Sequence, residues 1–168
     1  MNNQAFIDAQ NMFLGAKVSD PTWKIDLKRF RVYLKMKYHV EEAYYFLGSY
    51  NSDYEDMYIS IQKSGYILVF REHSQKMIGK KKGNVDTDIV FSIMRKLYKR
   101  ENFNSVVLVS GDGDYYRMVK FLIEENRFAK LLMPNKKFAS SLYKTLPDRY
   151  KDYLDASDVK KKIEYRNQ

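Results

Sequence analysis

Five short apolar runs along the chain predict the strands of a buried sheet. They occupy residues 5–7, 43–47, 66–70, 106–109 and 130–133. Their near-continuous apolar character is typical of strands that are buried on both faces, as in a parallel sheet. Between them, apolar residues recur every three or four positions over 27–38, 85–97 and 115–123, and more weakly over 53–62, which predicts helices. Alternating strands and helices predict an α/β fold with a central, mainly parallel sheet covered by helices on both faces.

The length and composition fit one main domain with a short appendage. The 168 residues are 45% hydrophobic and 30% charged. We expect the domain to span residues 1–145. Residues 146–168 are expected to form an edge strand with a terminal helix, or a partly loose tail of the same domain. No stretch of about 18 uncharged apolar residues occurs, so we expect no membrane span, and the lack of Cys and of a secretory leader favours the cytoplasm.

The charge balance favours a polyanionic partner. Thirty Lys and Arg against 21 Asp and Glu give a net charge of +9 at pH 7, which suits nucleic acid better than an anionic membrane. The densest basic region lies between residues 76 and 100, and its candidates for phosphate contact are Lys80, Lys81, Lys82, Arg95 and Lys99. The alternative explanation of residues 80–82 is an ordinary solvated charge run.

Acidic residues gather where a parallel sheet places its active crevice, beyond the carboxyl ends of the strands. Five acids follow a predicted strand or open a predicted helix: Asp8, Asp86, Asp88, Asp112 and Asp114. Neighbouring strands are about 4.8 Å apart, so carboxylates at adjacent strand ends can converge around one ion. Carboxylates held close together repel one another, and Mg²⁺ relieves that repulsion while activating water for attack on a phosphodiester.

The acids that follow the strands also have structural explanations. Asp8 stands in an apolar strand, where an unpaired charge is costly, and this favours a functional role. Asp112 lies between two glycines at a strand end, where function explains it better than turn formation. Those glycines permit unusual backbone angles and close approach, so that the strand can reverse into a helix. Asp114 is explained equally well as the N-cap of that helix and as a metal ligand.

The two acids at the start of the helix over 85–97 point in different directions. Asp86 and Asp88 are about 200° apart on a regular helix, so both cannot face one site. The apolar stripe of the helix spans the direction of Asp86, which makes Asp86 the better ligand candidate. Asp88 is then a first-turn acid that complements the helix dipole.

Three segments give the chain a family resemblance. Residues 6–11, 81–86 and 109–115 read FIDAQN, KKGNVD and VSGDGDY. In sequence, order and rough spacing they resemble the NYN-domain proteins, the LabA-like branch of the PIN-like nucleases, over about residues 4–145. The resemblance implies a Rossmann-like, PIN-type three-layer sandwich and a ribonuclease site that depends on Mg²⁺ or Mn²⁺.

The resemblance also implies roles for individual residues. The catalytic and metal-binding set it implies is Asp8, Asp86, Asp112 and Asp114. Asn11 would orient the first Asp or a metal-bound water, and Ser110 would support the turn or contact phosphate. Some relatives carry a further acid one helical turn beyond the position of Asp86, where this chain has Ser92. Others carry it two residues along, where this chain has Asp88, so Asp88 is a supporting candidate.

The sequence is therefore interpreted as a cytoplasmic ribonuclease that hydrolyses RNA, single-stranded in the first place, with water activated on Mg²⁺ or Mn²⁺. The alternative is a non-catalytic RNA-binding or regulatory NYN module that keeps the geometry of the site without turnover. A third interpretation is an assembly protein whose Tyr-rich terminal region docks a partner. Formation of a homo-oligomer is left open.

Overall fold

The computed structural model describes residues 2–71 and 85–166. Its central sheet consists of parallel strands. The described strands are β1 Asn3–Asp8, β2 Val40–Leu47, β3 Ile67–Phe70, β4 Val106–Val109, β5 Phe128–Met133 and β6 Lys151–Tyr153. Their order is β3-β2-β1-β4-β5-β6, and each neighbouring pair is parallel. The order reverses between β1 and β4, which is where doubly wound sheets open a crevice at their carboxyl edge.

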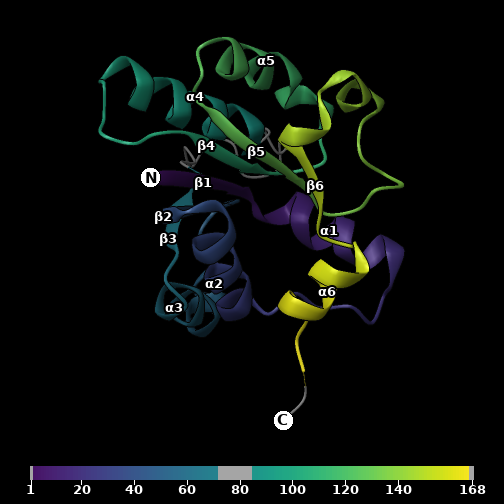
Figure 1. Cartoon of the computed structure of the whole chain (residues 1–168). Helices are drawn as coiled ribbons and strands as arrows, with labels where there is room; N and C mark the ends of the chain where they lie inside the picture. The colour runs from purple at the N-terminus through teal and green to yellow at the C-terminus, as the bar shows by residue number, and fades with distance from the viewer. Residues whose placement is uncertain (1, 72–84, 167–168) are drawn as a thin grey trace, which may run out of the picture.

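Helices cover both faces of the sheet and make three layers (Figure 1). The described α-helices are α1 Ala9–Ser19, α2 Leu27–Tyr38, α3 Glu55–Lys63, α4 Val85–Tyr98, α5 Tyr116–Glu124 and α6 Ser157–Ile163. Short 3₁₀ turns are η1 Ser52–Tyr54, η3 Gly113–Tyr115, η4 Ser141–Thr145 and η5 Asp148–Tyr150. Helices α4 and α5 pack on one face, and α1, α2, α3 and α6 lie on the other.

Two hydrophobic clusters, one on each face, explain why the strands read as continuous apolar runs. In β1, Ala5 and Ile7 belong to the cluster under α1 and α2, whereas Phe6 belongs to the cluster under α4 and α5. All four residues of β4 alternate between the same two clusters and are fully buried. Burial on both faces leaves no polar side to the strand. The predicted α/β sandwich with a mainly parallel sheet is confirmed, and the sheet is parallel throughout its described strands.

Helix α1 is an element that the apolar pattern did not predict. Its buried positions are Ala9, Met12 and Ala16, a narrow stripe of mostly small side chains. Exposed Phe13 and Leu14 stand on its other side. Apolar residues on both sides obscure the helical period, because the alternation of apolar and polar positions is what reveals it.

The last stretch of the chain forms an edge strand and a helix. Strand β6 pairs with β5 from Leu131↔Lys151 to Met133↔Tyr153. Helix α6 buries Val159 and Ile163, and the carbonyl of Ile163 accepts a hydrogen bond from the backbone N–H of Asp26 at 2.8 Å, just before α2. None of the helices in the described ranges is both long and apolar enough to cross a membrane.

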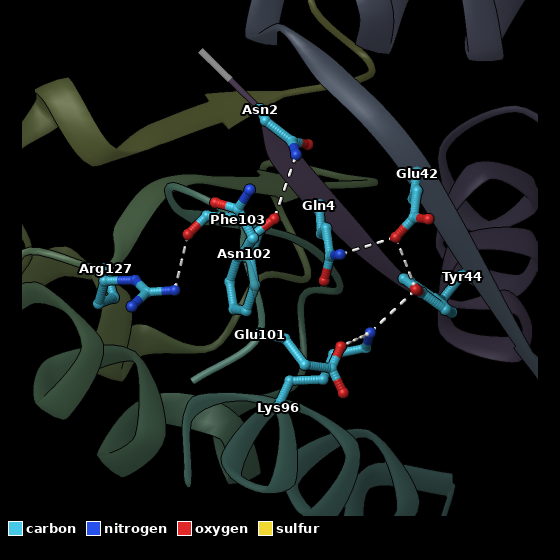
Figure 2. A network of polar contacts seen from close by, with 9 residues as sticks. All are labelled: Asn2, Gln4, Glu42, Tyr44, Lys96, Glu101, Asn102, Phe103 and Arg127. Carbon is cyan, nitrogen blue, oxygen red and sulfur yellow. Dashed lines mark hydrogen bonds and ion pairs between the residues drawn. The ribbon is translucent and has the colours of Figure 1, made fainter. Parts of the chain in front are cut away.

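A polar network joins the carboxyl-terminal end of α4 to strands β1 and β2 (Figure 2). The Nζ of Lys96 donates to the hydroxyl of Tyr44 at 2.9 Å and to Oε2 of Glu101 at 2.6 Å. Glu42 accepts from both Tyr44 and Gln4, at 2.8 and 2.7 Å. Lys96 is therefore engaged in structure, although it lies within the basic stretch of the sequence.

Candidate active site

A cleft of about 1260 Å³ opens at the carboxyl edge of the sheet, beside the point where the strand order reverses. Its walls come from the ends of β1 and β2, Arg71 just after β3, the turn after β4, helix α1, the first residues of α4 and parts of the segments 48–58 and 134–139. Three of the predicted acids line it: Asp8, Asp86 and Asp112. The topology thus brings together carboxylates that are up to 104 positions apart in the sequence.

Asp8 is the buried centre of this group, with 7% of its surface exposed. It points to the same face as Phe6 because side chains alternate along a strand. Its Oδ1 accepts from the backbone N–H of Asn11 at 3.0 Å, which caps α1, and its Oδ2 accepts from the hydroxyl of Tyr115 at 3.1 Å. Burial raises the pKa of Asp8 above 3.8, these two hydrogen bonds oppose the rise, and the charges of Asp112 and Asp86 add to it.

The segment after β4 is a turn held by its own side chains. Ser110 is fully buried, and its Oγ accepts from the backbone N–H of Asp112 at 3.1 Å. Oδ1 of Asp112 in turn accepts from the backbone N–H of Asp114 at 3.0 Å and caps η3. Asp112 therefore caps η3, and the N-cap of α5 is Tyr115, without a side-chain hydrogen bond, so the capping explanation of Asp114 is wrong. Asp112 combines turn formation with a place on the wall of the cleft.

Contacts with α1 and with η4 fix this turn from both sides. The side-chain Oδ1 of Asn11 accepts from the backbone N–H of Gly111 at 2.8 Å, which joins the end of β1 to the end of β4. The hydroxyl of buried Tyr143 donates to the backbone carbonyl of Asp112. Asn11 thus orients Asp8 through its backbone, while its side chain holds the turn that carries Asp112.

The glycines of the turn allow neighbouring segments to pack closely against the backbone, and they do not adopt unusual backbone angles. Neither Gly111 nor Gly113 has a positive φ, in contrast to Gly65 at 93°. A Cβ on Gly113 would lie 2.5 Å from Oγ of Ser140 and 3.1 Å from its Cβ. The part of the prediction that invoked unusual angles is wrong for these two residues, because the segment 140–142 packs against an otherwise ordinary backbone.

Asp86 and Asp114 complete the acidic group from the other side of the turn. Asp86 is half-buried in the first turn of α4, and Asp114 is exposed in η3. The charge of Asp112 raises the pKa of Asp114 most, followed by desolvation, the charge of Asp86 and a hydrogen bond with Asp86. Asp112 and Asp86 therefore lie close enough to influence both Asp8 and Asp114.

The remaining candidates lie elsewhere. Asp88 is half-buried on α4 and is not part of the cleft wall. Arg95 is exposed on α4, about 14 Å along the helix axis from Asp86, and Lys99 is exposed just beyond the last residue of that helix. Residues Lys80, Lys81 and Lys82 lie outside the described ranges.

The donor set suits a hard divalent cation, because Mg²⁺ and Mn²⁺ prefer carboxylate oxygens. Burial mainly raises the pKa of Asp8 and the charge of Asp112 mainly raises that of Asp114, and a bound cation would favour the ionised form of both carboxylates. Over residues 2–71 and 85–166, no three His, Asp or Glu side chains form a cluster that would hold an ion in its present arrangement.

Sequence reasoning missed two side chains at the site. Tyr115 was interpreted as part of the apolar stripe of the following helix, yet its hydroxyl binds Asp8. Arg71 directly follows β3 and lines the cleft. Its position after an apolar run is the signal that would have found it, since every strand of the sheet ends at this edge. No local pattern indicates that the hydroxyl of Tyr115 turns toward Asp8.

The three-layer fold with a central parallel sheet (Figure 1) is consistent with a PIN-like sandwich. The family model of the NYN domain matches residues 4–153, and the chain belongs to this family. It is 24% identical to the Low amplitude and bright protein LabA of Synechococcus elongatus, over 95% of this chain and 86% of LabA. The resemblance inferred from the three sequence segments is confirmed.

A solved structure extends the likeness to the fold. The crystal structure of a protein of unknown function from Vibrio parahaemolyticus superimposes with a TM-score of 0.72 and 18% identity. The match covers 98% of this chain and 96% of the other. PIN-like nucleases generally use divalent metals, and NYN nucleases act on RNA.

Proposed function

We propose that this protein is a ribonuclease that hydrolyses RNA phosphodiesters with the help of Mg²⁺ or Mn²⁺. The observation that carries the proposal is the buried carboxylate of Asp8 at the switch-point cleft, with the charges of Asp112 and Asp86 acting on it. Keeping several carboxylates close together costs stability, and a function explains why a basic protein does so.

The four acids Asp8, Asp86, Asp112 and Asp114 would hold the cation. When bound, such an ion lowers the pKa of a coordinated water and offsets the charge of the phosphate. The chain itself positions the ligands. Asp8 is held by the backbone of Asn11 and the hydroxyl of Tyr115, and Asp112 is held through the turn that Ser110 and Asn11 support. Preorganised ligands lose little freedom on binding.

The net charge of +9 would attract and retain the polyanionic substrate. The proposed contacts with the RNA backbone are Lys80, Lys81, Lys82, Arg95 and Lys99. Each such contact releases counterions from the RNA, so binding should weaken as salt increases. The proposed substrate is single-stranded, because an unpaired strand can enter the cleft without a duplex having to open.

A cleavage assay with matched acid variants tests the proposal. Labelled single-stranded RNA is incubated with wild type in Mg²⁺, in Mn²⁺ and in EDTA, and with Asp86→Asn and Asp88→Asn in metal. We expect wild type and Asp88→Asn to cleave the RNA in the presence of metal. Wild type in EDTA and Asp86→Asn in metal should show no cleavage. The two variants make the same chemical change two residues apart, and only Asp86 lines the cleft.

Other results would redirect the interpretation. Undiminished cleavage in verified metal-free EDTA contradicts the metal mechanism. RNA binding without cleavage under any metal condition identifies the non-catalytic RNA-binding module. Equal loss of activity in Asp86→Asn and Asp88→Asn would contradict the assignment of the acidic cleft as the active site, because only Asp86 lines it.

A further inference from the structure

An aromatic cluster forms the wall of the cleft at the ends of β2 and β3. Tyr50, in the loop after β2, is 54% exposed and lines the cleft. Its ring packs against Tyr58 and Phe70, each at a centroid distance of 5.5 Å, and these two rings lie 4.8 Å apart in a T-shaped pair. Tyr58 is buried at 6% exposure. The cluster therefore supports Tyr50 from behind and leaves about half of its surface open.

Arg71 follows Phe70 directly and presents a charge beside this cluster. Its backbone N–H donates to the carbonyl of Gly48 at 3.1 Å, which anchors the residue to the end of β2. Its side chain lines the cleft and is half-buried, and its Nη1 is buried with no hydrogen-bond partner in the described part of the chain. Within residues 2–71 and 85–166, Nη1 has no acceptor, and a guanidinium at the cleft wall can donate to a phosphate oxygen of a ligand.

A flat ring and a guanidinium on the wall of one cleft match the base and the phosphate of a nucleotide. Every base has a π-face that stacks on an exposed aromatic side chain, and phosphate oxygens accept hydrogen bonds from guanidinium groups. The bases of a duplex are stacked on one another and unavailable to such a ring. The occupant that fits is therefore an unpaired nucleotide within a strand.

We infer that Tyr50 and Arg71 form a nucleotide-binding subsite of the cleft, in which a base of single-stranded RNA stacks on Tyr50 and a backbone phosphate binds Arg71. The inference rests on the proposed function for the identity of the substrate. It adds a binding site on the β2–β3 side of the cleft, supplied by residues outside the acidic group. The subsite positions the strand and performs no chemistry.

Binding in EDTA tests the stacking half without any cleavage. The full chain is titrated against a short fluorescein-labelled single-stranded oligoadenylate, followed by fluorescence anisotropy. Tyr50→Ala should raise the Kd about tenfold, whereas Tyr50→Phe should keep the wild-type Kd because the ring remains. Tyr98→Ala is the matched control, since Tyr98 is 89% exposed on α4 and is not part of the cleft wall.

The phosphate half has a different signature. Arg71→Gln should weaken binding and reduce the slope of log K against log salt by about 0.7, the value for one phosphate contact with a single strand. Tyr50→Ala should leave that slope unchanged. Arg117→Gln is the matched control, because Arg117 is exposed on α5 and is not part of the cleft wall. Arg71→Gln should also fold as stably as wild type, because no described hydrogen bond of the side chain is lost.

The subsite is overturned if wild type does not bind the oligoadenylate, or if the Tyr50 and Arg71 variants bind it like their controls. It is also overturned if these variants weaken binding to a fully paired RNA duplex as much as binding to the single strand. Tyr50→Leu retains apolar bulk without a flat ring, so weak binding by this variant with a native circular dichroism spectrum separates stacking from misfolding. Wild type that binds through the subsite but never cleaves contradicts the proposed ribonuclease and leaves the subsite standing.

Discussion

Replacing Tyr115 with Phe removes one hydroxyl from the centre of the molecule. Tyr115 is fully buried, and its hydroxyl donates to Oδ2 of Asp8 at 3.1 Å. The ring of Phe keeps the apolar packing, so the change isolates this hydrogen bond. If Asp8 is held as a buried carboxylate, the variant loses one of the two donors that oppose its desolvation.

The magnitude follows from the charge of the acceptor. A hydrogen bond to a charged group contributes about 1.5–3 kcal/mol to stability, and a neutral bond about 1 kcal/mol. We therefore expect Tyr115→Phe to lower the free energy of unfolding by about 2 kcal/mol near neutral pH, and by about 1 kcal/mol where Asp8 is protonated.

The sign of the pH dependence comes from the raised pKa of Asp8. A carboxyl whose pKa is higher in the folded state contributes stability below its unfolded value of 3.8, and this stability is lost as the pH rises through the folded pKa. Without the hydroxyl of Tyr115, the folded pKa of Asp8 rises further. More stability is then lost at neutral pH in the variant than in wild type.

Urea unfolding followed by circular dichroism measures this difference at about pH 7 and about pH 3.5. Tyr98→Phe is the control, because Tyr98 is 89% exposed and the same atom is removed there. An equal loss of stability at both pH values, or a loss no larger than that of the control, would refute the view that Tyr115 stabilises the ionised form of Asp8.

Two further variants test the turn after β4. Asp112→Asn keeps the oxygen that accepts from the N–H of Asp114 and removes the charge that raises the pKa of Asp114, so the melting temperature in EDTA should stay level or rise. In wild type, Mn²⁺ at a hundredfold excess over Kd should stabilise the fold by about 2.7 kcal/mol and raise the melting temperature accordingly. In Asp112→Asn this rise should be smaller, and an undiminished rise argues against Asp112 as a ligand. Gly113→Ala should cost about 1–3 kcal/mol, because the new Cβ would lie 2.5 Å from Oγ of Ser140. Gly48→Ala, whose Cβ would meet nothing within 4 Å, should be neutral or stabilising in the same melts, and equal effects of the two changes would contradict the close packing.

Much of the architecture is readable from local sequence patterns. Strand β4 was predicted with its observed bounds, as was α2, and α4 was predicted to within one residue. Burial is a property that each segment carries in its own side chains, so runs and periods of apolar residues reveal strands and helices directly. The rule that acids following parallel strands share one edge likewise predicted the meeting of Asp8 with Asp112.

Only the tertiary structure decided which of these groups became neighbours and how each is held. The order β3-β2-β1-β4-β5-β6 places Asp8 beside the turn after β4, and no local pattern specifies which strands pair. The hydroxyl of Tyr115 reaches Asp8 across 107 positions, the ring of Tyr50 packs on that of Phe70, and Tyr50 and Arg71 both line the cleft. Side-chain periodicity encodes which face of an element is buried, whereas contacts between distant elements depend on packing the whole chain. For that reason the sequence was sufficient to determine the family and to predict that Asp8, Asp86 and Asp112 lie along one edge of the sheet. The capping of η3 by Asp112 and the support of Asp8 by Tyr115 depend on the fold.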